Sequence, residues 1–136
     1  MYLLDTNICI YALKGTYPEL TKKLLSIPPS EIFISSITVS ELEYGAAKSQ
    51  WGERTRTIMQ SFLANFEILP FDENDAICLG RFRASLARAG TPIGAYDVMI
   101  AAQGFARGLT VVTHNVREFS RIPGLLVEDW ALGSNQ

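Results

Sequence analysis

The fold class of this 136-residue chain is decided near its start, where residues 2–10 read YLLDTNICI. Three apolar residues, 2–4, are typical of a short buried strand, and the polar tip Asp5-Thr6-Asn7 interrupts them. The apolar pattern then resumes with helical spacing up to Leu13. We therefore predict a strand that passes directly into a helix, which is the repeating unit of α/β proteins.

The rest of the chain repeats this alternation of apolar strand signals and helical periodicity. Strands are predicted over 32–37, 66–71, 109–113 and 125–127, and helices over 19–27, 41–49, 51–66, 72–89 and 95–107, with a short turn or helix at 115–119. Residues 38–41 show the pattern of a capping box, which would place Glu41 in the first turn of its helix. We predict an α/β/α sandwich around a central parallel sheet.

Length and composition favour one domain over residues 1–132 and a flexible tail at 133–136. The apolar content of 48% is enough for one core, and no apolar run reaches the roughly 20 residues that span a bilayer. Cys9 and Cys78 lack metal-ligand spacing and are interpreted as reduced, buried thiols. We expect a cytoplasmic protein without membrane association. The net charge of −2 argues against a general polyanion binder.

Three acids occupy positions where a parallel sheet would collect functional residues. Asp5 ends the first strand, and Glu41 begins the helix after the second main strand. Asp97 lies near the start of a helix that itself precedes the strand at 109–113, so its placement follows less directly. Each acid alone could simply cap a helix or favour its dipole. The apolar run 98–102 after Asp97 makes a charge there costly unless it is paired or metal-bound. We expect the three acids to lie together.

Four segments carry a resemblance to a known family: residues 3–7, 36–42, 96–101 and 112–119. Their order and spacing resemble the four motifs of PIN-domain nucleases, and in particular the VapC toxins of bacterial toxin–antitoxin pairs. The resemblance covers nearly the whole chain and implies Mg²⁺- or Mn²⁺-dependent cleavage of RNA. Residues 90–97, GTPIGAYD, are similar to members that cut the anticodon stem-loop of initiator tRNA.

The same resemblance assigns roles to individual residues. Asp5 and Asp97 are the expected direct metal ligands, and Glu41 would hold a water molecule on the metal or a second ion. Water attack in line with the leaving group would leave 5′-phosphate and 3′-hydroxyl ends. Without metal, the gathered carboxylates should repel one another and some of their pKa values should rise.

The fourth acidic position departs from the family pattern, because Asn115 stands where many relatives have an aspartate. Glu118, one turn later, is the predicted fourth acid, with Asn115 as its neutral hydrogen-bonding partner. The alternative for Glu118 is a surface ion pair with a neighbouring arginine. Thr6 and Thr113 are expected to orient Asp5 and the phosphate, and His114 is interpreted as an exposed residue at a strand end.

Two other functions compete with the nuclease. An aspartate-nucleophile phosphatase needs a second aspartate two residues after Asp5, and this chain has Asn7 there. A catalytically weak binding module of the same fold stays open as the alternative.

Two basic groups are either solvated helix faces or phosphate contacts: Arg54 with Arg56, and Arg81 with Arg83 and Arg88.

The resemblance also implies partners. A cognate VapB-like antitoxin would lay a helix into an apolar groove and point a basic side chain at the acids. Tyr11, Trp51 and Phe62 are candidate groove residues, with core packing as the alternative for each. RNA, with tRNA the favoured class, is the expected substrate, and a homodimer is the expected assembly.

Overall fold

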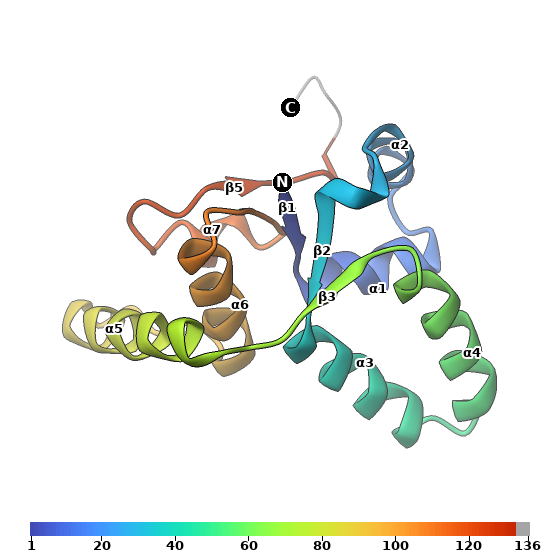
Figure 1. Cartoon of the computed structure of the whole chain (residues 1–136), viewed down its shortest axis with the longest axis horizontal. Helices are drawn as coiled ribbons and strands as arrows, with labels where there is room; N and C mark the ends of the chain where they lie inside the picture. The colour runs from blue at the N-terminus through green and yellow to red at the C-terminus, as the bar shows by residue number, and fades with distance from the viewer. Residues whose placement is uncertain (133–136) are drawn as a thin grey trace.

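A five-stranded parallel sheet runs through the part of the chain that the computed structural model describes, residues 1–132 (Figure 1). The order across the sheet is β3-β2-β1-β4-β5. The strands are β1 (Tyr2–Leu4), β2 (Ile32–Ser35), β3 (Glu67–Leu69), β4 (Thr110–Val112) and β5 (Val127–Glu128). The predicted tail, residues 133–136, lies outside the described residues. The predicted α/β/α fold with a parallel sheet is confirmed.

Helices cover both faces of the sheet. They are α1 (Thr6–Lys14), α2 (Pro18–Ser26), α3 (Ser36–Lys48), α4 (Gly52–Leu63), α5 (Glu73–Ala89), α6 (Ala95–Ala106) and the short α7 (Val116–Phe119), and a single 3₁₀ turn spans Pro29–Glu31. Neighbouring residues of β1 point to opposite faces. Leu3 therefore packs in the cluster beneath α5 and α6, and Leu4 packs in the cluster beneath α1, α3 and α4. None of the helices in the described residues is long and apolar enough to cross a bilayer.

The start of α3 differs from the sequence prediction. The strand expected over 32–37 ends at Ser35, and α3 begins at Ser36 rather than near Glu41. The cap is Ser35, whose hydroxyl accepts a hydrogen bond from the backbone N–H of Ile37 at 3.0 Å. The predicted capping box at 38–41 is therefore wrong. Glu41 lies in the second turn of the helix, where no capping role explains it.

The order of the strands reverses direction at β1, which is the topological switch point of the sheet. From β1 the chain proceeds outward through β2 and β3, then crosses to β4 on the other side of β1 and ends at β5. In open parallel sheets a crevice forms outside the carboxyl ends of the strands at such a point. Asp5 directly follows β1 and Thr113 directly follows β4, so both lie at this crevice.

Gly104 lets α6 approach the sheet closely. A Cβ atom at this position would lie 2.6 Å from Cγ2 of the buried Val111 and 3.6 Å from Cδ2 of Leu3. We expect Gly104→Ala to lower the free energy of unfolding by about 1–3 kcal/mol through overpacking, measured by urea denaturation. The matched control is Gly80→Ala in α5, where a Cβ meets nothing within 4 Å. The control should stabilise by about 0.5–1 kcal/mol, and equal effects of the two changes would contradict the packing argument.

Candidate functional site

Asp5 lies at the carboxyl end of β1 with only 2% of its surface exposed. Its Oδ1 accepts a hydrogen bond from the backbone N–H of Ile8 at 2.8 Å and so caps α1. The side chain of Thr113 donates a further hydrogen bond to the carboxylate. Asp5 is thus a helix cap, as one alternative held. However, a cap needs neither this depth of burial nor a second donor from another strand.

Glu41 is held by a relay of two hydroxyl groups. Oγ1 of Thr6 donates to Oε1 of Glu41 at 2.6 Å, and the hydroxyl of Thr38 lies 3.0 Å from the same Thr6 oxygen. Since Thr6 gives its proton to Glu41, the hydroxyl of Thr38 supplies the proton of the second bond. Thr6 was expected to orient Asp5, but its hydroxyl fixes Glu41 instead. This contact ties the start of α1 to the second turn of α3.

Asp97 and Glu118 approach from α6 and α7. Asp97 is half-buried in the first turn of α6, and Glu118 is half-buried in α7. The side-chain amide of Asn115 donates to Glu118, while the backbone N–H of Asn115 donates to Oγ1 of Thr113 at 2.9 Å. The same Thr113 therefore joins Asp5 to the segment that carries Glu118. The partner of Glu118 is an amide, and the surface arginine pair considered as its alternative is not formed.

The electrostatics of these carboxylates show that they form one cluster. Burial raises the pKa of Asp5 from 3.8 to about 6, against the hydrogen bonds from Thr113 and Ile8 that lower it. The negative charges of Asp97 and Glu41 raise it further. Burial also raises the pKa of Asp97, with the charges of Glu118 and Glu41 acting in the same direction. The acids are thus close enough to disfavour one another's ionised forms, as predicted for a site without cations.

The donor set suits a hard divalent cation. The cluster offers carboxylate oxygens, which are the ligands that Mg²⁺ prefers, and a cation there would relieve the mutual repulsion that raises the pKa values of Asp5 and Asp97. Within residues 1–132 no three His, Cys, Asp or Glu side chains converge tightly enough to enclose an ion by themselves. Mg²⁺ sites commonly use one or two carboxylates and leave the other positions to water and substrate phosphate.

Comparison with known proteins identifies the family. The sequence profile of the PIN domain matches residues 2–125. A tRNA(fMet)-specific endonuclease VapC of Salmonella typhimurium is 48% identical over 129 residues, which cover 95% of this chain and 97% of the relative. The chain belongs to the VapC ribonuclease toxins of the PIN-domain family. A VapC of Shigella flexneri with the same description is 42% identical, with 96% and 98% of the two chains covered.

The fold of this VapC toxin agrees with that assignment. The VapC chain in the crystal structure of DNA-bound VapBC from Salmonella typhimurium superimposes with a TM-score of 0.90. The two sequences are 46% identical there, over 95% of this chain and 97% of that one. The predicted recognition, fold and ribonuclease activity are therefore confirmed. That solved structure is a toxin–antitoxin complex, which is the kind of assembly expected of a VapC toxin.

His114 lies just beyond the end of β4, as the sequence indicated, but its side chain is only partly exposed. Its Nδ1 lies 2.9 Å from Oδ2 of Asp129, and the side chain is 34% exposed. The imidazole ring also packs against two tyrosines, with centroids 6.1 Å from Tyr11 and 5.1 Å from Tyr17. Asp129 holds His114 in place, and the acid follows β5 in a segment that sequence reasoning did not connect with this edge of the sheet.

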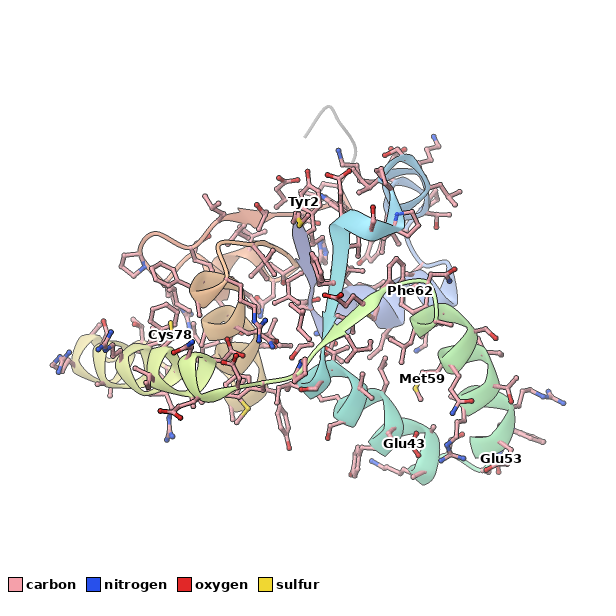
Figure 2. All side chains as sticks on the ribbon, viewed as in Figure 1. Tyr2, Glu43, Glu53, Met59, Phe62 and Cys78 are labelled. Carbon is pink, nitrogen blue, oxygen red and sulfur yellow. The ribbon has the colours of Figure 1, made fainter. Side chains whose placement is uncertain are left out.

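Arg56, in the basic group at residues 54–56, is bonded to two acidic side chains. Arg56 donates hydrogen bonds to Glu43 of α3 and Glu53 of α4, and these contacts raise its pKa. Figure 2 shows both glutamates at the end of the α3–α4 pair that lies away from the sheet. The guanidinium of Arg54 lies 5.6 Å from the centre of the Trp51 ring. Arg56 therefore belongs to a solvated helix face, as one of the two alternatives held, and it forms ion pairs there with Glu43 and Glu53.

Thr38 is a site residue that the sequence did not suggest. It is fully buried, and its hydroxyl completes the relay to Glu41 through Thr6. A signal for it was present, because Thr38 and Glu41 stand three residues apart and share a helix face. The misplaced helix start concealed that signal, since it put Thr38 at a cap position outside the helix.

Proposed function

We propose that the chain acts as one nuclease domain over residues 1–132 that hydrolyses a phosphodiester bond in the anticodon loop of initiator tRNA, with Mg²⁺ or Mn²⁺ as cofactor. The observation that carries the proposal is the cluster itself: the nearly buried Asp5 lies within the electrostatic reach of both Asp97 and Glu41, and Asp97 within that of Glu118. Such a like-charged group at the carboxyl edge of a parallel sheet is destabilising unless a cation joins it.

Each residue has a distinct role in this proposal. Asp5 and Asp97 hold the ion, and the hydroxyl of Thr113 fixes the orientation of Asp5. When bound, the ion would lower the pKa of the attacking water and neutralise charge on the scissile phosphate. Glu41, which the hydroxyl of Thr6 holds at 2.6 Å, positions the water and accepts its proton.

Glu118 and Asn115 complete the site as its fourth corner. The amide of Asn115 donates to the carboxylate of Glu118, which fixes the rotamer of the acid. From this position the negative charge of Glu118 raises the pKa of Asp97, and its carboxylate offers a further oxygen ligand for a cation. The neutral amide thus takes the place of a fifth charge, which would raise the cost of the ion-free cluster still further.

The proposed substrate rests on sequence similarity to two relatives. The two relatives from Salmonella typhimurium and Shigella flexneri are described as tRNA(fMet)-specific endonucleases. Residues 90–97, which resemble the same subgroup, comprise the loop 90–94 and the start of α6, which carries Asp97. This loop is therefore placed to contact whatever RNA enters the site.

A cognate VapB-like antitoxin is the proposed partner, and the structure offers it a groove of about 440 Å³ between α1, α3 and α4. Apolar side chains line most of the groove, Glu41 lies on its wall, and Figure 2 shows Met59 between α3 and α4. An amphipathic helix seated here could direct a basic side chain at Glu41. The residues first suggested for this groove do not line it: Tyr11 and Phe62 pack against other aromatic side chains, and Trp51 lies beyond it.

The test uses purified toxin with initiator tRNA and an elongator tRNA as matched substrates, in Mg²⁺ and in EDTA. We expect one cut in the anticodon loop of the initiator only, leaving a 5′-phosphate, and no cut in EDTA. End mapping of the products by sequencing provides the measurement. Equal cleavage of both tRNAs would contradict the substrate proposal, and undiminished cleavage in EDTA would contradict the metal. Binding of the tRNA without any cleavage would favour the weak binding module.

A further inference from the structure

Two tyrosine side chains stand largely exposed beside the carboxylate cluster. Tyr96 immediately precedes Asp97 and is 53% exposed, and Tyr44 follows Glu41 by one helical turn and is 67% exposed. Tyrosine carries a large apolar ring that is usually covered in a folded protein. Tyr44 shares α3 with Glu41, and Tyr96 shares α6 with Asp97. Both exposed rings are available to a ligand.

The two tyrosines lie on helices that contact each other, Tyr96 on α6 and Tyr44 on α3. Tyr96 shares a helical stripe with Ile100 and Gln103, and the amide of Gln103 donates to backbone carbonyl groups at the end of β3. That stripe is thus directed toward the β2–β3 side of the sheet, from which α3 emerges. Tyr44 lies on the stripe of Ile37, which packs against the cluster that contains Ile100. Both tyrosines therefore continue helical stripes that reach the same core cluster.

A cation accompanies one of the rings. Nζ of Lys48 lies 5.5 Å from the centre of the Tyr44 ring, within the range of a cation–π contact. Proteins that bind single-stranded nucleic acid combine aromatic stacking with basic groups that follow the backbone. The Tyr44–Lys48 pair offers both, one turn from Glu41.

The charge of the site favours stacking as a source of affinity. The chain has a net charge of −2, and acids surround the point where a scissile phosphate must lie. Arg56 is already bonded to Glu43 and Glu53, so this arginine can add little phosphate neutralisation to the binding of RNA. Stacking on unpaired bases adds affinity without bringing more phosphates to the acids.

We infer that Tyr44 and Tyr96 stack on unpaired RNA bases on either side of the scissile phosphate, and so position single-stranded or loop RNA for cleavage. The inference rests on the proposed function and adds to it the way in which the substrate is held. It also accounts for a preference for loops, because the faces of paired bases in a helix are covered by their neighbours.

The test measures the Kd of a fluorescein-labelled RNA hairpin with an open loop in the Asp5→Asn background, where the RNA is expected to bind without being cut. We expect Tyr44→Ala and Tyr96→Ala each to raise the Kd about tenfold. Tyr44→Phe and Tyr96→Phe keep the ring and should stay close to the parent. Trp51→Ala is the matched control, because Trp51 is 60% exposed but lies beyond the end of α3, at the N-cap of α4, and the Kd of this variant should not change. In the active protein the same alanine variants should raise KM more than they lower kcat.

Unchanged affinity in both alanine variants would overturn the inference, as would equal losses in the alanine and phenylalanine variants. If the alanine variants keep RNA affinity but lose affinity for the antitoxin, the tyrosines belong to the antitoxin interface and the inference is wrong. A parent protein with Asp5 intact that neither binds nor cuts the hairpin would overturn the proposed function first. That result is distinguishable, because it does not depend on the tyrosines.

Discussion

Replacing Asp5 by asparagine is expected to lower the rate of RNA cleavage by more than about 100-fold while leaving the protein folded. Loss of a residue that merely orients a metal ligand already costs about 10- to 100-fold, so loss of a ligand should exceed this. Asparagine is as good a helix cap as aspartate, and its amide oxygen can still accept the hydrogen bond from Ile8. The change therefore separates the capping role of Asp5 from its chemical role. The measurement is kcat/KM on an RNA hairpin at saturating Mg²⁺.

The matched control is Asp72→Asn. Asp72 also caps a helix, α5, and it contacts Arg107 at the end of α6 opposite to Asp97. Its replacement is the same chemical change at a cap outside the carboxylate cluster, so the cleavage rate should stay close to the wild-type value. If Asp5→Asn and Asp72→Asn reduce cleavage alike, Asp5 acts only as a cap and the catalytic assignment is wrong.

The second large effect concerns stability and pH in the absence of metal. The pKa of Asp5 is about 6 in the folded chain, against 3.8 for the ordinary group. Between these values the folded state binds more protons than the unfolded state, so stability is lost as the pH rises. The expected loss from pH 4 to pH 7 is about 2 kcal/mol from Asp5 alone. The raised pKa of Asp97 acts in the same direction.

Urea denaturation in EDTA at several pH values measures this effect. Asp5→Asn should remove most of the loss, and at pH 7 the variant should be more stable than the wild type. Mg²⁺ or Mn²⁺ should restore stability to the wild-type protein only, because binding to the folded state adds RT ln(1 + [L]/Kd). A wild type whose unfolding free energy is the same at pH 4 and pH 7, and unmoved by either ion, would contradict a strained acidic site.

The arrangement of strands and helices could be predicted because the apolar patterns are strong and the strands are short. Residues 2–10 alone showed a strand leading into a helix, and the structure has β1 and α1 there. The start of α3 could not be placed, because residues 32–37 are apolar except for Ser35 and Ser36 and suit both a strand end and a helix start. The hydrogen bond between the hydroxyl of Ser35 and Ile37 decides between them, and such a cap competes with several similar patterns nearby.

The site could be predicted in its acids but not in its supporting contacts. Asp5, Glu41 and Asp97 follow from strand ends and family motifs, and the structure brings them together. Thr6 contacts Glu41 from 35 residues away, and His114 meets Asp129 across the β4–β5 edge. These pairings depend on the register between elements, which local patterns do not encode. Hydroxyl groups in particular can serve any of several neighbours, so their partners emerge only from the packed structure.

The central claim is that Asp5 and Asp97 jointly bind a divalent cation. X-ray diffraction from crystals of the toxin soaked in Mn²⁺ tests it most directly, because anomalous scattering locates the ion without assumptions about activity. We expect a peak in contact with both carboxylates, and its loss in crystals of the Asp97→Asn variant. A peak bound elsewhere in the chain, or none at Mn²⁺ concentrations that support RNA cleavage, would contradict it.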